Sequence, residues 1–308
     1  MANAVGILPF FRHILIVGMG LVGGSVSRAL RRAGYTGRIS GMDSHAPSLA
    51  EALRLDLADD APDSPSAAAD ADLVLIAVPV ARTEAVLLSL CPFLRQDTIV
   101  TDAGSTKSGV AAAARRVLGE RAGIFVAGHP IAGSEKNGPA AATADLFAGK
   151  RVVITPSPDN TREALDKVSA VWAACGATVH MMTPDEHDRV FAVVSHLPHL
   201  LAYALVDMVS RHSSADRLFQ YAASGFRDFT RIAASSADMW RDISMANGAH
   251  LLEELDRYLR ELQELRDMLV NRDADNVHAL YLRARQARLD WEDIIESGEK
   301  RSDITDRS

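Results

Sequence analysis

The chain of 308 residues lacks several features that would define a class of protein. It has two cysteines, Cys91 and Cys175, which are too few for a disulfide framework, so we expect buried thiols in a reducing compartment. No apolar run approaches the roughly 20 residues of a membrane-spanning helix, and the first ten residues lack the basic start of a signal peptide. These absences predict a cytoplasmic protein without membrane contact.

Patterns of charge and of metal ligands are equally sparse. The formal net charge is -7 and the arginines are spread along the chain, which argues against nucleic-acid binding. The sequence contains no C-x-x-C, H-E-x-x-H or G-x-S-x-G motif, so we predict neither a metal centre nor a serine hydrolase site. Hydrophobic residues make up 48% of the chain, which is enough for a large core. We therefore expect the chemistry to come from an organic cofactor.

The first part of the chain alternates short apolar runs with longer amphipathic stretches, which is typical of a parallel sheet with crossover helices. After Thr183 only helical periodicity remains, and Thr183-Pro184-Asp185-Glu186 predicts a helix start. We predict strands at 13–17, 38–42, 73–77, 98–101, 124–127, 152–155 and 178–181, and a loop with at most one short element over 56–70. The sequence thus predicts an α/β domain (1–183) with a mostly parallel sheet, an all-α domain (184–296) and a disordered polar tail (297–308).

One long amphipathic helix is predicted over residues 251–269. Its apolar side chains recur at three- and four-residue spacing: Leu255, Leu259, Leu262, Leu265 and Leu269. Such a stripe must be buried, either inside the helical domain or against a second subunit. The spacing alone favours neither partner.

A glycine-rich turn follows the first predicted strand and leads into a helix, with the sequence Gly18-Met19-Gly20-Leu21-Val22-Gly23. In a G-x-G-x-x-G turn the first glycine permits the tight bend, the second lets the backbone approach a pyrophosphate, and the third lets helix and strand pack closely. Glycines also mark ordinary turns, but here the strand, the helix and a downstream acid agree. The motif predicts that the α/β domain is Rossmann-like and binds a dinucleotide.

The downstream acid is Asp43, twenty residues after Gly23 at the end of the second strand. A carboxylate there accepts hydrogen bonds from ribose hydroxyls and would repel a 2′-phosphate, which favours NAD over NADP. The alternative is that Asp43 caps a helix near Pro47. Further cofactor contacts are predicted where the next two strands end, at Val78, Pro79, Asp102 and Gly104.

His129 is the leading acid–base candidate, since it lies just past a predicted strand and imidazole titrates near neutral pH. A histidine before a proline is often structural. Ser105, however, ends another strand and could hydrogen-bond the ring, while Lys107 could serve the site or a helix start. We therefore expect His129 to accept a hydroxyl proton while hydride leaves the same carbon.

Five further motifs occur in a fixed order: Thr101–Lys107, His129–Glu135, Ser195–His199, Gly225–Arg231 and Met239–Ile243. Together with the glycine-rich turn they make the sequence resemble the prephenate/arogenate (cyclohexadienyl) dehydrogenases of tyrosine biosynthesis, over about residues 12–295. The resemblance implies NAD-dependent oxidative decarboxylation of prephenate to 4-hydroxyphenylpyruvate, of arogenate to tyrosine, or of both. It also implies a homodimer formed through the helical domain.

The resemblance assigns roles to individual residues. His129 resembles the catalytic histidine that acts on the ring hydroxyl, Ser105 its hydrogen-bonding partner, and Arg231 the arginine that binds the ring carboxylate. By the same resemblance, His199 and His196 would line the substrate pocket. Glu135 and Trp240 would lie near its entrance or come from a neighbouring subunit. Trp240 could instead be a core residue and His196 a buried, satisfied histidine.

Other interpretations remain. A β-hydroxyacid dehydrogenase-like oxidoreductase would use a catalytic lysine in the helical domain, yet residues 184–296 contain no lysine. A non-catalytic NAD-binding interaction protein would need neither His129 nor Arg231. Within the resembling family, an acid such as Glu135 would favour arogenate by pairing with its ammonium group, but we favour prephenate.

Overall fold

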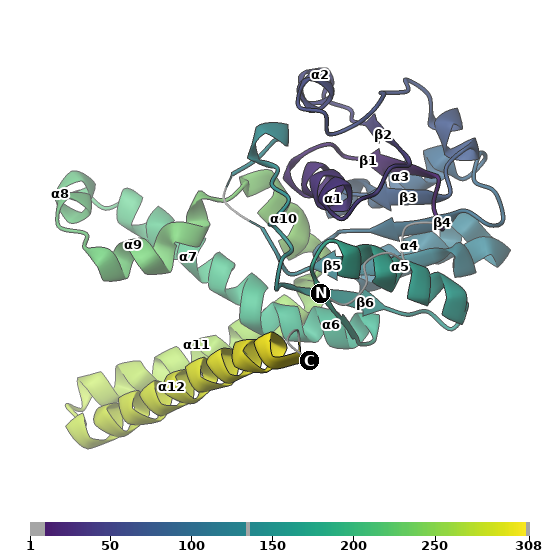
Figure 1. The fold of residues 1–308 in the computed structure, drawn as a ribbon. Coiled ribbons are helices and arrows are strands. Elements are labelled where there is room, and N and C mark those ends of the chain that lie inside the picture. Colours follow the sequence, from purple (N-terminus) through teal and green to yellow (C-terminus); the bar gives the residue numbers. More distant parts are fainter. Residues whose placement is uncertain (1–9, 134–135, 306–308) are drawn as a thin grey trace. The chain divides into compact units, whose positions relative to one another are not determined.

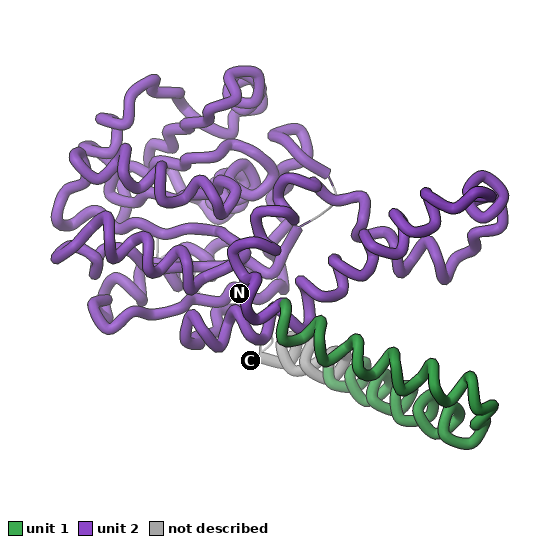
Figure 2. Tube along the Cα trace, turned by 180° about the vertical axis from the view of Figure 1, so that it is seen from behind, with its two compact units in different colours: residues 1–5, 252–308 green, residues 6–251 purple. Residues whose placement is uncertain are grey.

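The computed structural model describes residues 10–133 and 136–305, with the backbone alone from residue 295 on. Contacts divide the chain into two units (Figure 2), one of residues 6–251 and one of residues 252–308 with the first five residues. The two units are described separately below.

A seven-stranded sheet forms the centre of the first unit (Figure 1), in the order β2-β1-β3-β4-β5-β6-β7. The strands are β1 (His13–Val17), β2 (Arg38–Met42), β3 (Leu73–Ile76), β4 (Ile99–Asp102), β5 (Phe125–Pro130), β6 (Arg151–Thr155) and β7 (Thr178–Met181). All neighbouring strands pair in parallel except β5 with β6. The predicted mostly parallel sheet is confirmed, with all seven strands present.

Helices cover both faces of this sheet: α1 (Leu21–Arg32), α2 (Ala46–Arg54), α3 (Thr83–Leu90), α4 (Ser108–Leu118) and α5 (Arg162–Ala174). Ile14 and Ile16 of β1 pack into the core cluster that contains residues of α1 and α5. Leu15 and Val17 pack into the other cluster, with residues of α3 and α4. Because successive side chains of a strand point to opposite faces, a strand buried on both sides is apolar throughout, which is why the first half of the sequence is readable as a sheet.

The end of β5 differs from the prediction. We expected the strand to end at Ala127 and His129 to lie in the loop behind it. Phe125 and Val126 pair with β4, but the strand continues to Pro130 because its second half pairs with β6, where His129 stands opposite Val153. His129 is therefore held in a strand ladder, and this antiparallel partner could not be inferred from local strand propensity.

The chain after Met181 is helical in the first unit as well: α6 (Pro184–Phe191), a π-helical turn (Ala192–His196), α7 (Leu197–Ser210), α8 (Ala215–Gln220), α9 (Ser224–Thr230) and α10 (Ala237–Ala246). Thr183 Oγ1 accepts a hydrogen bond from the Glu186 N–H at 3.2 Å, so the predicted helix start is confirmed. The loop over 56–70 holds one short element, a 3-10 turn at Pro65–Ala69. The contacts group these helices with the sheet as far as Leu251, and a domain boundary near residue 183 remains a proposal.

One helical stretch corrects the sequence analysis. Residues Pro184–Ser210 form 27 helical residues that are long and apolar enough to cross a membrane by length and composition. Core helices of soluble proteins meet the same criterion, and several side chains of this stretch, including Phe191, Ala192 and His196, are buried within the first unit. The sequence analysis predicts no apolar run of this length, and Pro184–Ser210 nevertheless meets the criterion of length and composition.

The second unit consists of most of α11 (Gly248–Val270) and of α12 (Ala274–Thr305). The helix predicted over residues 251–269 is confirmed, and Arg272 adopts a left-handed φ of 53° in the turn between the two helices. The disordered tail predicted from Ser297 is wrong as far as Thr305, because α12 continues to that residue. Glu299, Lys300 and Arg301 favour a helix on their own, and a lack of apolar periodicity shows only that no face is buried.

Candidate active site

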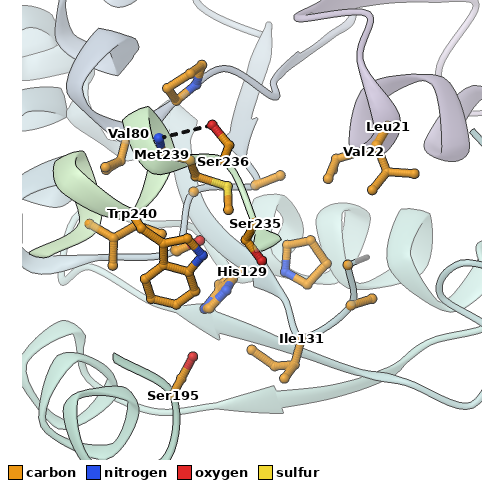
Figure 3. Close-up of a pocket in the computed structure, with 18 of the residues that line it drawn as sticks. Leu21, Val22, Val80, His129, Ile131, Ser195, Ser235, Ser236, Met239 and Trp240 are labelled. Carbon is orange, nitrogen blue, oxygen red and sulfur yellow. Dashed lines mark hydrogen bonds between the residues drawn. The ribbon is translucent and has the colours of Figure 1, made fainter. Parts of the chain in front are cut away.

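A cavity of about 640 Å³ lies within the first unit, at the carboxyl ends of β1, β3, β4 and β5. In Figure 3, Leu21 and Val22 at the start of α1 lie on one side, Met239 and Trp240 of α10 lie on the other, and His129 lies between them. The lining includes Gly20, Leu21, Val22, Val78, Pro79, Gly104, Ser105, His129, Phe191, Ser195, His199, Arg231, Ser236, Met239 and Trp240. The strand ends that carry the predicted cofactor and catalytic residues thus meet the helical segment in one cavity.

Each glycine of the G-x-G-x-x-G turn has a distinct physical requirement. Gly18 has a φ of +101°, and a Cβ there would lie 2.4 Å from the Ala77 carbonyl oxygen. A Cβ at Gly23 would lie 2.0 Å from the Gly18 carbonyl oxygen, whereas a Cβ at Gly20 would meet nothing within 4 Å. Among the described residues no side chain caps the start of α1, so its first N–H groups are available to a phosphate. The turn therefore fits the pyrophosphate of a dinucleotide.

Asp43 fastens this turn to the end of β2. Its Oδ2 accepts the Met19 N–H at 2.9 Å and its Oδ1 accepts the His45 N–H at 2.8 Å. The Met19 side chain is buried, so Met19 shapes the turn and does not line the cavity. Helix α2 starts at Ala46 without a side-chain cap, which corrects the alternative that Asp43 caps it. A carboxylate oxygen has more than one acceptor site, so hydrogen bonds to a ribose remain possible.

Asp102 is not part of the cavity lining, which corrects its prediction as a cofactor contact. The side chain is fully buried, and its oxygens accept the N–H groups of Gly104 and Gly128 at 2.9 and 3.0 Å. The ammonium of Lys107, also fully buried, lies 2.5 Å from Asp102 Oδ2 and donates to the Gly128 carbonyl at 2.7 Å. Burial lowers the pKa of Lys107 while Asp102 opposes the shift. The pair joins the ends of β4 and β5 directly before His129.

His129 makes its hydrogen bond with a residue other than the one expected. Its Nδ1 lies 2.8 Å from Nε2 of His187 on α6, and its ring packs edge-on against Phe191 at 5.0 Å between centroids. Ser105 lines the same cavity, but among the described residues the hydrogen-bond partner of the His129 ring is His187. Burial lowers the pKa of His129 well below its usual value, and the charges of His187, Lys107 and His196 add to the shift. The ring is therefore neutral near pH 7, as a proton acceptor must be.

The sequence analysis missed His187 and Asp188. The His187 ring is fully buried, and its Nδ1 lies 2.8 Å from Asp188 Oδ1. Asp188 also accepts the Lys107 and Ser108 N–H groups at the start of α4, each at 2.8 Å. Burial alone would raise the pKa of Asp188, but these bonds lower it to about 2. The only signal in the sequence is an adjacent His-Asp pair on the first turns of a helix.

His199 and Trp240 form the wall of the cavity on the helical side. Their rings stack at 3.6 Å between centroids with an angle of 17°. His199 Nδ1 lies 2.8 Å from the Ser195 carbonyl oxygen, which orients the ring. Both residues line the cavity as predicted, so Trp240 is more than a core residue.

His196 lies outside the cavity lining. It is buried, and its Nδ1 accepts a hydrogen bond from Asn247 Nδ2 at 3.0 Å. The same amide donates to the Asp188 carbonyl oxygen at 2.7 Å. Burial lowers the pKa of His196 to about 4. The alternative of a buried, satisfied histidine is confirmed, and the predicted direct contact of His196 with substrate is corrected.

Arg231 lines the cavity, whereas two arginines near it in the sequence, Arg227 and Arg241, are not part of the lining. Arg241 pairs with Asp238 and Asp242 at 2.8 Å on an exposed face, and Arg227 lies 4.0 Å from Asp228. The prediction for Glu135 falls outside the described residues. Among the described residues, Arg231 is therefore the cation placed to meet an anionic substrate in the cavity.

A glycine-rich phosphate turn, a neutral buried imidazole and an arginine around one cavity define a nicotinamide-dependent oxidoreductase. Comparison with known proteins identifies the family. The nucleotide-binding domain of prephenate dehydrogenase matches residues 26–181, and the dimerization domain of prephenate dehydrogenase matches residues 183–283. The chain belongs to the prephenate dehydrogenase family, and it is an NAD-binding oxidoreductase.

Individual relatives agree with this assignment. The chain is 36% identical to the cyclohexadienyl dehydrogenase of Zymomonas mobilis over 92% of this chain and 97% of the relative. It is 37% identical to the prephenate dehydrogenase of Bacillus subtilis over 89% of this chain and 75% of the relative. The structure of A. aeolicus prephenate dehydrogenase in complex with hydroxyphenyl propionate and NAD+ superposes with a TM-score of 0.85 and 36% identity, covering 91% of this chain and 98% of that one. The resemblance found in the sequence is confirmed, and the alternative classes of protein are not supported.

Proposed function

We propose that the enzyme converts prephenate to 4-hydroxyphenylpyruvate by NAD-dependent oxidative decarboxylation. The observation that carries this proposal is His129, a neutral imidazole in the same cavity as Arg231 and the cofactor turn. NAD, when bound, accepts the hydride from the C4 carbon of the substrate ring. The free N–H groups at the start of α1 and the open space at Gly20 would hold its pyrophosphate.

The residues of the chain bind and orient the substrate. Prephenate is a dianion, and the guanidinium of Arg231 can hold its ring carboxylate bidentately. His129 accepts the proton of the C4 hydroxyl as positive charge develops at C4. The ring carboxylate then leaves as CO₂, its bonding electrons complete the aromatic ring, and the proton returns to the phenolic oxygen. Aromatisation makes the step irreversible, so alignment and exclusion of water are the main tasks of the protein.

Prephenate is favoured over arogenate by the charges of the cavity. The described lining residues include Arg231 but no aspartate or glutamate. Among the described lining residues the ammonium group of arogenate finds no carboxylate partner, whereas the keto group of prephenate needs none. The arogenate dehydrogenase of Synechocystis has a similar fold. It superposes with a TM-score of 0.76 and 28% identity over 91% of this chain and 99% of that one.

NAD is favoured over NADP by Asp43, whose carboxylate at the end of β2 would repel a 2′-phosphate. The decisive experiment measures kcat/KM for prephenate and arogenate, each with NAD and NADP, by absorbance of the reduced nicotinamide. We expect the highest value for prephenate with NAD. A higher value for arogenate would overturn the substrate, and no reduction with either compound would overturn the function.

We also propose a cytoplasmic homodimer formed through the helical part of the chain. The matching dimerization domain supports it, as do the exposed leucines of the predicted stripe on α11, Leu259, Leu262 and Leu269. A single chain leaves this stripe in water, which favours burial against a second subunit. Sedimentation equilibrium should give twice the mass of the chain, and a monomer at micromolar concentration would contradict the proposal.

A further inference from the structure

Three side chains from two elements form a linear chain of hydrogen bonds that ends in the cavity. Asp188 Oδ1 lies 2.8 Å from His187 Nδ1, and His187 Nε2 lies 2.8 Å from His129 Nδ1. Phe191 packs against both rings, with centroids 4.5 Å from His187 and 5.0 Å from His129. His187 and Asp188 do not line the cavity, so any effect on the substrate passes through His129.

The partners determine where the protons lie. Asp188 is a carboxylate with a lowered pKa that already accepts two backbone N–H groups, so it accepts the third bond from His187 Nδ1–H. A neutral His187 with its proton on Nδ1 has only a lone pair on Nε2. His129 must then donate from Nδ1, which leaves the lone pair of His129 on Nε2.

We propose that His187, itself oriented by Asp188, is a positioning residue that holds His129 in the tautomer whose Nε2 accepts the substrate proton. This inference rests on the proposed function, in which His129 accepts the proton of the C4 hydroxyl. Without His187, the two neutral tautomers of His129 would compete, and one of them presents an N–H to the hydroxyl. The arrangement also strengthens when His129 gains its proton, because its Nδ1–H becomes the donor of a charge-assisted bond to His187.

The start of α4 gives the chain a fixed anchor. The Lys107 and Ser108 N–H groups bind the two oxygens of Asp188, one each, so the carboxylate cannot turn away from His187. Asn247 also holds the backbone of Asp188, because its side-chain Nδ2 donates a hydrogen bond to the Asp188 carbonyl oxygen. The His187 ring, which is fully buried, has no solvent to replace either partner.

The tautomer can be measured without substrate or activity. In protein labelled with ¹⁵N-histidine, the His129 signals are those that disappear in the His129→Asn variant. We expect an unprotonated, pyridine-type Nε2 and a protonated, pyrrole-type Nδ1 at pH 7.5. In His187→Leu, which has no acceptor, we expect both nitrogens to show averaged values. A protonated Nε2 in the unaltered enzyme would overturn the inference.

Two substitutions of His187 test the effect on the reaction. His187→Leu should lower kcat by about 10- to 100-fold with the KM for prephenate changed less than about threefold, because orientation of the base is lost and binding is not. In His187→Gln the side-chain oxygen can accept the His129 Nδ1–H, and kcat should recover to within about fivefold of the unaltered enzyme. Equal losses in both variants, or a loss that appears only in KM, would contradict a positioning role.

His13→Gln is the matched control. His13 is a buried histidine at the opposite end of β1, where its Nε2 lies 2.8 Å from Ser40 Oγ. Its replacement should leave kcat within about twofold, since no described contact joins it to the cavity. The NMR result can be as expected while the unaltered enzyme reduces NAD with neither prephenate nor arogenate. In that case the proposed function fails, but the positioning of His129 by His187 stands.

Discussion

Replacement of Lys107 by methionine, an unbranched side chain without the charge, should strongly destabilise the protein. Lys107 and Asp102 are both fully buried and lie 2.5 Å apart. Removal of one partner from a buried ion pair costs about 3–5 kcal/mol because the other charge is left uncompensated. Two N–H groups still bind Asp102 in the variant, so we expect the cost of the lost ion pair to lie near the lower end of this range. The Gly128 carbonyl also loses a hydrogen bond worth about 1 kcal/mol.

Urea denaturation of Lys107→Met beside the unaltered protein measures this cost. For a unit of this size, about 3–5 kcal/mol corresponds to a fall in Tm of about 6–20 °C. The double variant Lys107→Met/Asp102→Asn has no buried charge at this position and should recover more than about 1 kcal/mol of the loss. Arg116→Met, which removes an exposed ion pair with Glu84, should cost less than about 1 kcal/mol.

Two results would refute the reasoning. A loss of stability below about 1 kcal/mol in Lys107→Met would show that the variant does not leave an uncompensated buried charge on Asp102. An additive double variant would show that the two side chains do not interact. Activity gives a second measurement, because Lys107 lowers the pKa of His129, and the acid limb of kcat/KM should therefore move to higher pH in the variant.

Four further predictions concern the cavity. His129→Asn should lower kcat by about 10²–10⁴-fold with little change in KM, and an unchanged kcat would remove His129 from the reaction. Because burial, with His187, Lys107 and His196, lowers the pKa of His129, kcat/KM should stay level from pH 8 down to about 6.5 and fall only below it; a decline that begins above pH 7 would contradict this. Arg231→Ala should raise KM for prephenate more than it lowers kcat, whereas Arg241→Ala, on an exposed face, should change neither. Gly23→Ala should abolish NAD binding measured by fluorescence titration, since its Cβ would lie 2.0 Å from the Gly18 carbonyl oxygen, while Gly109→Ala, which meets nothing within 4 Å, should bind normally.

The stability of the folded protein, like kcat/KM, should decrease at acidic pH. Burial lowers the pKa values of His129, His187 and His196, so these rings are neutral in the folded protein. The unfolded chain binds protons at its ordinary histidine pKa of about 6.5, so it binds more protons than the folded protein below that pH. The free energy of unfolding therefore falls as pH decreases below about 6.5.

Local signals predicted most of the architecture. Strands buried on both faces read as continuous apolar runs, and the glycines of the turn are required by contacts within one strand–turn–helix unit, such as that between Gly23 and Gly18. The errors have two causes: pairing between distant segments, and helix propensity in a stretch that buries no face. β5 continues past Ala127 because β6 pairs with it, and α12 extends past Ser297 although no apolar stripe marks it.

The site shows the same division. Residue type and position predicted Gly20, Ser105 and His129, and the resemblance to the family implied His199, Arg231 and Trp240. The structure places all six in the lining of one cavity. Asp102 was misplaced because its burial depends on Lys107, and His196 because its partner is Asn247, 51 residues further on. His187 was missed because the adjacent His187-Asp188 pair does not reveal by itself that the His187 ring meets His129.

By itself the sequence determined the dinucleotide turn, because that turn depends on residue type at short spacing. Its ordered motifs determined the family through their resemblance to known proteins, and they predicted His129 as the proton acceptor. Only the tertiary structure decided how that acceptor is oriented. The His129 ring meets His187 across 58 residues of sequence, and Asp188 behind it is held by the backbone at the start of α4. A tautomer is set by a hydrogen-bond partner in space, and no local pattern of residues contains that information.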